Sequence, residues 1–186
     1  MDKKQIVDLI KLFKVSGGLK RIKRTGWVLK GIQEAESVAD HVFRVVFMCS
    51  ILAPGRKLDE KKLLDMALIH DLGETATSDI RWQEGKKLLA PQASKDKIEE
   101  SILKQILHFS KNEKYYLSLF YEFRDQTSPE AKFLKQVEKL EMALQALEYQ
   151  EFGAKKELMN EFFENANKYI SDPDFKRMFE ELEKAR

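Results

Sequence analysis

The chain has 186 residues, of which 43% are hydrophobic and 34% are charged. This composition excludes a disordered or fibrous chain, and the length suits one well-packed domain better than two. Thirty-three lysines and arginines are balanced by thirty-one acidic residues, so the net charge of +2 gives no electrostatic reason to expect a nucleic-acid-binding protein.

Cys49 is the single cysteine, which excludes an intrachain disulfide and favours a reducing compartment. It follows the apolar residues VVFM, so we expect a buried structural thiol. No segment reaches transmembrane length, and the first residues lack the apolar region of a signal peptide. We therefore expect a cytoplasmic protein without a membrane partner.

The first half of the chain predicts helices separated by glycine and proline. Apolar residues recur at helical spacing almost throughout, which indicates an all-α fold. A short helix around residues 6–13 ends at Gly17-Gly18, and a polar connection runs to about residue 35. Ser37 can cap the next helix, which ends at Pro54-Gly55.

The third predicted helix leads into a loop. Asp59 can cap this helix, whose apolar stripe includes Leu63 and His70 and which fades near Gly73. Residues 79–93 contain glycine and proline and read as a long surface loop, the kind that often covers a site.

The second half of the chain completes a predicted bundle. Two core-facing helices are marked by Ile98, Ile102 and Ile106, and by Tyr116, Leu119, Phe120 and Phe123. Ser128-Pro129 is a strong start signal for a long helix that ends before Gly153. Its apolar seam alternates spacings of four and three: Phe133, Val137, Leu140, Leu144 and Leu147. Two further helices, around Leu158, Phe162 and Tyr169 and then after Asp172-Pro173, complete a single domain over residues 1–186.

Two of the three histidines lie in predicted helices beside an aspartate. His41 follows Asp40, and His70 precedes Asp71. Adjacent helical residues differ by about 100°, so His70 and Asp71 can converge on one point. Glu74 follows His70 by four positions and Asp71 by three, which places it near the same face.

A histidine from one helix and a His-Asp pair from another suit a divalent cation. The lack of further cysteines excludes a thiolate-rich structural zinc site and favours an open, water-bearing one. From spacing alone, the alternative is that both histidines are satisfied core residues and the carboxylates are solvated helix charges. A G-x-S-x-G elbow and a phosphate-cradling glycine-rich loop are absent from the sequence.

Three sequence blocks resemble the HD-domain metal phosphohydrolases. They are LKRIKRTGWVLKGIQEAESVADH, ALIHDLGETATSDI and SPEAKFLKQVEKLEMALQALEYQ. In this order they are similar to the branch that contains the 5′-deoxynucleotidases and HD domain-containing protein 2. The resemblance runs over about residues 19–150 and implies an HD-type helical bundle, with additional helices at 155–185.

The resemblance implies a set of metal ligands. His41, His70 and Asp71 correspond to three of the family's ligands. The fourth ligand in the family is an aspartate, and Glu138 occupies its position here. The extra methylene of Glu138 is a departure that predicts a different metal preference, position or affinity.

The resemblance also implies residues around the substrate. Glu74 and Asp79 match positions that hold, protonate or deprotonate groups around the scissile phosphate. Trp27 matches an aromatic residue that contacts the deoxyribose. The arginine that directly precedes this tryptophan in the bacterial enzymes is Gly26 here, and Arg24 is the nearest substitute for pairing with phosphate.

The implied reaction is metal-dependent hydrolysis of deoxyribonucleoside 5′-monophosphates to deoxynucleoside and phosphate, with Mn²⁺, Co²⁺ or a similar divalent cation as cofactor. The resemblance also implies a homodimer. One alternative is a nucleotide-binding or sensing HD domain with little turnover, which Glu138 permits. Another is an HD-fold oxygenase with two irons, which is disfavoured because only His108 remains among the histidines, and we expect His108 to be structural or exposed.

Overall fold

The structure is a computed structural model that describes the backbone of residues 1–75 and 92–186 and the side chains of residues 1–74 and 97–186. It is all-α, as the periodicity predicts, and in the described residues the only β-pairing is one bridge between Lys23 and Ser37. The described helices are α1 (Lys3–Ser16), η1 (Gly17–Lys20), α2 (Thr25–Leu29), α3 (Val38–Leu52), α4 (Glu60–Ile69), η2 (Leu72–Thr75), α5 (Gln92–Leu107), α6 (Glu113–Asp125), α7 (Pro129–Glu151), α8 (Lys156–Tyr169) and α9 (Pro173–Lys184).

Three long helices begin where the sequence predicts. The side chains of Ser37, Asp59 and Ser128 each accept a hydrogen bond from the backbone N–H three residues further on, which satisfies a donor that the first turn leaves unpaired. Pro129 occupies the first turn of α7, where its missing N–H has no consequence. These helix starts are confirmed.

The polar connection predicted between the first two long helices contains two short helices, η1 and α2. Each is about one turn long, too short for an apolar period to be visible in the sequence. Their order comes from tertiary packing, because Leu19 of η1 and Trp27 of α2 are both buried in the core.

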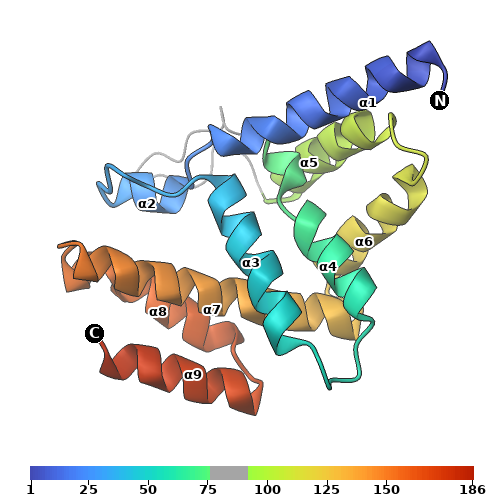
Figure 1. The fold of residues 1–186 in the computed structure, drawn as a ribbon. Coiled ribbons are helices and arrows are strands. Elements are labelled where there is room, and N and C mark those ends of the chain that lie inside the picture. The colour runs from blue at the N-terminus through green and yellow to red at the C-terminus, as the bar shows by residue number, and fades with distance from the viewer. Residues whose placement is uncertain (76–91) are drawn as a thin grey trace.

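Helix α7 is the central element of the bundle. It packs against α3, α4, α6, α8 and α9, and Figure 1 shows α3 crossing it while α8 runs alongside it. The predicted seam is confirmed in its main part, since Phe133, Val137, Leu140 and Leu147 are buried. In the described part of the chain, no helix is both long enough and apolar enough to span a membrane.

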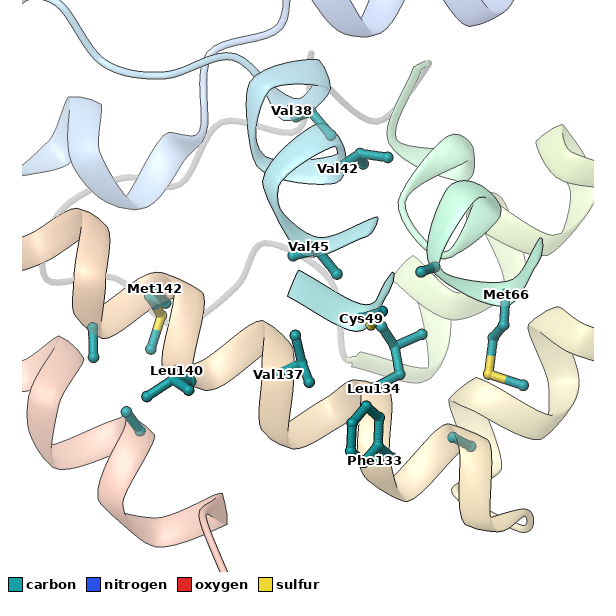
Figure 2. Packing of buried hydrophobic residues seen from close by; sticks show 14 of the residues in the cluster. Val38, Val42, Val45, Cys49, Met66, Phe133, Leu134, Val137, Leu140 and Met142 are labelled. Atoms are coloured by element: carbon teal, nitrogen blue, oxygen red, sulfur yellow. The ribbon is translucent and has the colours of Figure 1, made fainter. Parts of the chain in front are cut away.

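Apolar residues of α3 and α7 form part of the core. Figure 2 shows Val45 and Cys49 of α3 lying against Leu134 and Val137 of α7. Burial raises the pKa of the Cys49 thiol to about 12, so the side chain is a neutral core group, as its apolar context predicts.

Several positions predicted to face the core are exposed. Leu158 and Tyr169 of α8 are exposed, and so is Ile98 of α5. The buried residues of α8 are Met159, Phe162, Phe163 and Ala166, so Phe162 is confirmed and Leu158 and Tyr169 are not. The reason is that charged and apolar residues mix in these helices, so more than one stripe fits the sequence pattern.

Candidate metal centre

The two predicted histidines and the adjacent aspartate converge in the structure. His41 comes from α3, His70 ends α4, and Asp71 follows it directly. One ligand atom from each of the three residues lies within 4.8 Å of the other two. The two imidazole ring centres are 5.6 Å apart, and His41 is completely buried. Residues separated in sequence by a whole helical hairpin therefore share one small volume.

The N-terminal turn of α3 determines where His41 lies. Ser37 and Asp40 form a reciprocal capping box, in which the backbone N–H of Ser37 donates to the Asp40 carboxylate at 2.8 Å. These hydrogen bonds lower the pKa of Asp40. Asp40 is thus a structural cap, and the next residue, His41, turns into the core toward Asp71.

His70 has a defined tautomer. Its Nδ1 atom is 2.7 Å from the carbonyl oxygen of Ala67. A backbone carbonyl can only accept a hydrogen bond, so Nδ1 carries a proton, and in the neutral ring the lone pair is then on Nε2. Nε2 lies 3.4 Å from Asp71 Oδ2, on the side of the candidate site.

The donor set fits a divalent cation. The Nε2 atoms of His41 and His70 are buried and have no hydrogen-bond partner among the described residues. Such unpaired buried atoms are rare, and a bound ion is one explanation for them. Burial lowers the pKa of His41 well below its ordinary range, and Arg24 adds to this effect, so the imidazole is neutral near pH 7. Neutral imidazole nitrogens beside a carboxylate are ligands that Zn²⁺ and similar metals accept.

Asp71 is the charged member of the group. Burial alone raises the pKa of a carboxyl group, but neighbouring groups, among them His70 and Arg24, outweigh this effect, and the pKa of Asp71 lies below its ordinary value. Arg24 Nη1 donates to Asp71 Oδ2 at 3.3 Å. The carboxylate is therefore ionised at neutral pH and already has one cationic neighbour.

Trp27 is connected to the site through other side chains. Its Nε1 donates to Glu36 Oε1 at 2.8 Å, and Glu36 pairs with Arg24 Nε at 3.4 Å. Burial and the charge of Glu141 raise the pKa of Glu36 to about 7, while Arg24 and Trp27 oppose the shift. The chain from Trp27 through Glu36 and Arg24 ends at Asp71.

The indole of Trp27 is 1% exposed. Its ring centre lies 4.0 Å from that of Phe162 and 5.1 Å from that of Tyr149, so both contacts are with core aromatic residues. A Cβ on Gly26 would lie 3.3 Å from the Phe162 ring, so an arginine at position 26 would need this ring to move. Arg24 is the basic residue that this segment does bring to the site.

Glu138 lies on α7 outside the group of three converging residues, as far as the described chain goes. Its carboxylate accepts hydrogen bonds from Lys135 at 3.0 Å and Lys139 at 3.4 Å. Burial favours the neutral acid, but the charges of Lys135 and Lys139 outweigh it and lower the pKa of Glu138. The side chain is thus an ionised carboxylate whose charge acts on His41 and Asp71.

Of the two predicted catalytic carboxylates, the structure describes Glu74 but not Asp79. Glu74 lies in η2, where its backbone N–H donates to the carbonyl of Asp71 at 3.0 Å. The turn of 3₁₀ helix keeps Glu74 next to the His-Asp pair, although not by the α-helical spacing that the sequence predicts. Asp79 lies outside the described residues.

Glu141 was missed by the sequence reasoning. It is completely buried on α7, and its Oε2 lies 2.6 Å from His41 Nδ1. Burial raises the pKa of Glu141, while Arg24 and Arg44 oppose the shift. A signal was available, because position 141 follows Val137 by four residues and so extends an apolar stripe, where a carboxylate is unusual.

Glu36, His41 and Glu141 form a second group of potential ligand atoms within 4.8 Å of one another. This group lies on the Nδ1 side of His41. Both of its carboxylates are already paired with an arginine, Glu36 with Arg24 and Glu141 with Arg44. Because its charges are paired, we interpret it as a hydrogen-bonded support and not as a cation site.

A groove of about 1010 Å³ opens on the other side of this support. It is lined by Glu36, Arg44 and Tyr149, and by the exposed aromatic side chains of Phe43 and Phe47. Its lining residues in the described chain do not include the three converging residues. The groove is therefore separate from the candidate metal centre.

The third histidine behaves as predicted. His108 is at the end of α5, and its side chain is 76% exposed. It lies 3.6 Å from Glu113 and takes no part in either group of potential ligands in the described chain. This placement leaves two histidines for the metal centre.

The chain is similar to known proteins over nearly its whole length. A relative from Mus musculus named 5′-deoxynucleotidase HDDC2 is 33% identical over 180 residues, which cover 96% of this chain and 88% of the relative. A Dictyostelium discoideum protein with the same name is 32% identical over 189 residues, covering 95% of this chain and 97% of the relative.

Solved structures agree with this similarity. A conserved hypothetical protein from Pyrococcus furiosus has a TM-score of 0.73 and 33% identity, covering 94% of this chain and 99% of that one. The PH0347 protein from Pyrococcus horikoshii has a TM-score of 0.70 and 30% identity, covering 95% and 99%. A model of the HD domain matches residues 16–179. The resemblance read from three sequence blocks is confirmed, and the chain belongs to the HD-domain family.

Proposed function

We propose that this protein is a metal-dependent 5′-deoxynucleotidase that hydrolyses deoxyribonucleoside 5′-monophosphates to deoxynucleoside and phosphate. One observation carries the proposal: His41, His70 and Asp71 present ligand atoms within 4.8 Å of one another, with both Nε2 atoms unpaired in the described chain. The names of the Mus musculus and Dictyostelium discoideum relatives supply the substrate class.

In this proposal, His41, His70 and Asp71 hold a divalent cation, with Glu138 as the fourth ligand in place of the family aspartate. When bound, the cation, Mn²⁺, Co²⁺ or a similar ion, would supply Lewis acidity and lower the pKa of a water molecule for attack on phosphorus. Asp71 is ionised and the imidazole of His41 is neutral, so these two side chains can bind without first losing a proton.

The substrate phosphate is neutralised by basic groups at the site. We assign this role to Arg24, which lies beside Asp71, and to Lys139, which lies beside Glu138. Glu74 and Asp79 position the attacking water, take up its proton and return a proton to the leaving 5′-oxygen. Trp27 acts indirectly, because it holds Glu36, which in turn pairs with Arg24.

The test is phosphate release from dAMP by the purified protein with Mn²⁺ or Co²⁺, compared with AMP to measure selectivity for deoxyribose. We expect turnover in the wild type and its loss in His70→Ala and Asp71→Ala. His108→Ala is the matched control, because it removes an exposed histidine away from the group and is expected to keep activity. Tight dAMP binding without phosphate release in the wild type would instead favour the sensing domain.

We also propose that the protein is a cytoplasmic homodimer whose partner in catalysis is a small deoxynucleotide and neither nucleic acid nor membrane. An exposed apolar face of α3 supports the dimer. Its side chains follow one another at intervals of four residues and are Phe43, Phe47 and Ile51. Contiguous exposed apolar surface of this kind marks association sites. Light scattering coupled to size-exclusion chromatography measures the mass directly, and a monomer mass would refute the dimer.

A further inference from the structure

Glu141 of α7 contacts the side of His41 that faces away from Asp71. Its Oε2 atom is 2.6 Å from His41 Nδ1, and both side chains are completely buried. The other ring nitrogen, Nε2, lies 3.7 Å from Asp71 Oδ2 and belongs to the candidate metal group. One nitrogen of the imidazole thus has a partner in the protein scaffold, and the other faces the candidate site.

The hydrogen bonds around Glu141 indicate which nitrogen carries the proton. Arg44 Nε donates to Glu141 Oε1 at 3.0 Å, and a carboxylate paired with a guanidinium acts as an acceptor. The proton of neutral His41 then lies on Nδ1, between the ring and Oε2. The opposite tautomer would leave a buried Nε2–H with no acceptor among the described residues, which is rarer in proteins than an unpaired acceptor.

Arg44 fixes Glu141 in turn. It lies one helical turn after His41 on α3. Its guanidinium contacts three side chains of α7, one of which is Glu141. Its Nη1 donates to Glu148 at 2.7 Å, and its Nη2 donates to Gln145. His41 and Arg44 of α3 therefore both contact Glu141 of α7, so each oxygen of its carboxylate has a partner.

We propose that Glu141 is a positioning residue of the metal centre, which holds His41 in the Nδ1–H tautomer and directs Nε2 toward the site shared with His70 and Asp71. The inference rests on the proposed function for one point, that the ligand is a divalent cation. A carboxylate behind a ligating histidine fixes the ring and strengthens its basicity, and its loss typically weakens metal binding about 10- to 100-fold.

The test variant is Glu141→Gln, which keeps the size of the side chain but introduces an amide that can donate as well as accept. His41 then no longer has a single preferred tautomer. Titration calorimetry with Mn²⁺ alone, without nucleotide, is expected to show binding that is weaker by about 10- to 100-fold. Binding equal to that of the wild type would overturn the assignment.

Glu148→Gln is the matched control. Glu148 also pairs with Arg44 on the same helix, and the described contacts of its carboxylate are with Arg44 and not with His41. We expect this variant to bind Mn²⁺ as the wild type does. An equal loss in both variants would mean that the Arg44 cluster acts through general packing, and it would overturn a specific role for Glu141.

If Glu141→Gln fails to fold, a second measurement on the wild type tests the role of Glu141. The ¹⁵N resonances of His41 in the metal-free wild type report its tautomer, and we expect protonation at Nδ1. Protonation at Nε2 would overturn the proposal. Both experiments omit nucleotide, so a wild type that binds Mn²⁺ but does not hydrolyse dAMP would refute the proposed function and leave the role of Glu141 intact.

Discussion

Glu138 is held by two lysines of its own helix. Its carboxylate contacts Lys135 and Lys139, although its charge acts on His41 and Asp71. To ligate a cation together with these residues, the carboxylate has to give up at least part of its pairing with the lysines. The extra methylene gives it a longer reach than aspartate, so its preferred geometry around an ion also differs.

We predict that Glu138→Asp changes the metal preference more than the fold. The carboxylate remains, but it is set back by one methylene, so the relative affinities for Mg²⁺, Mn²⁺ and Co²⁺ are expected to shift by about tenfold. The free energy of unfolding is expected to change by less than about 1 kcal/mol. Calorimetry with each metal and urea unfolding measure the two quantities.

The control for this change is Glu148→Asp, the same substitution further along α7. It alters a partner of Arg44 and is expected to leave the relative affinities for the three metals unchanged. Identical affinities for all metals in Glu138→Asp and wild type would remove the reason for assigning position 138 as a ligand.

The sequence is sufficient to predict some residues of the candidate site and insufficient to predict others. His41, His70 and Asp71 can be found because histidine is rare in this chain and because the His-Asp dipeptide falls at a predicted helix end. Glu141 could not be assigned a partner, because His41 lies 100 residues away and periodicity gives no register between two helices. The burial of Trp27 could not be predicted from the sequence either, since it depends on packing against Phe162 of α8.

Among the elements, η2 has an unusually close approach to α5. A Cβ on Gly73 would lie 3.0 Å from the Cβ of Glu99 and 3.2 Å from its backbone oxygen. The backbone of α5 cannot move away as easily as the end of a flexible side chain. Gly73 therefore allows the turn that carries Asp71 and Glu74 to lie against α5.

We predict that Gly73→Ala destabilises the protein by about 1–3 kcal/mol, because the added methyl group forces η2 and α5 apart. Gly17→Ala is the control, since no heavy atom lies within 4 Å of a Cβ at position 17 and its φ of −61° suits any residue. We expect this control to be neutral or slightly stabilising. Chemical unfolding of both variants measures the difference, and equal stabilities would contradict the close approach.

Helix boundaries were predictable where side chains define them, and helix faces were predictable only in part. Ser37, Asp59 and Ser128 are local signals, because each cap acts over three residues. Helix α2 has no comparable signal, and the buried face of α8 depends on its packing against α7. Local chemistry thus gave the starts of the long helices, whereas tertiary contacts decided the short helices and the orientation of the later ones.

At the scale of the whole molecule, α7 connects the candidate site to the core. One face of α7 supplies Val137 and Leu140 to the core, and Glu138 and Glu141 lie beside them in sequence. The C-terminal helices α8 and α9 pack on this same helix, and Phe162 of α8 reaches the Trp27 ring. We therefore propose that residues 1–186 form one cooperative domain.

We predict that urea unfolds the protein in a single transition. Trp27 is packed between residues of α7 and α8, so its fluorescence reports on the docking of the C-terminal helices, whereas far-UV circular dichroism reports on all helices. Trp82→Phe removes the second tryptophan and makes the fluorescence specific. If α8 and α9 belong to the same unit as α3 and α7, both signals have one midpoint, because a two-state domain loses all its contacts together. Separate midpoints would show that the C-terminal helices fold as a unit of their own.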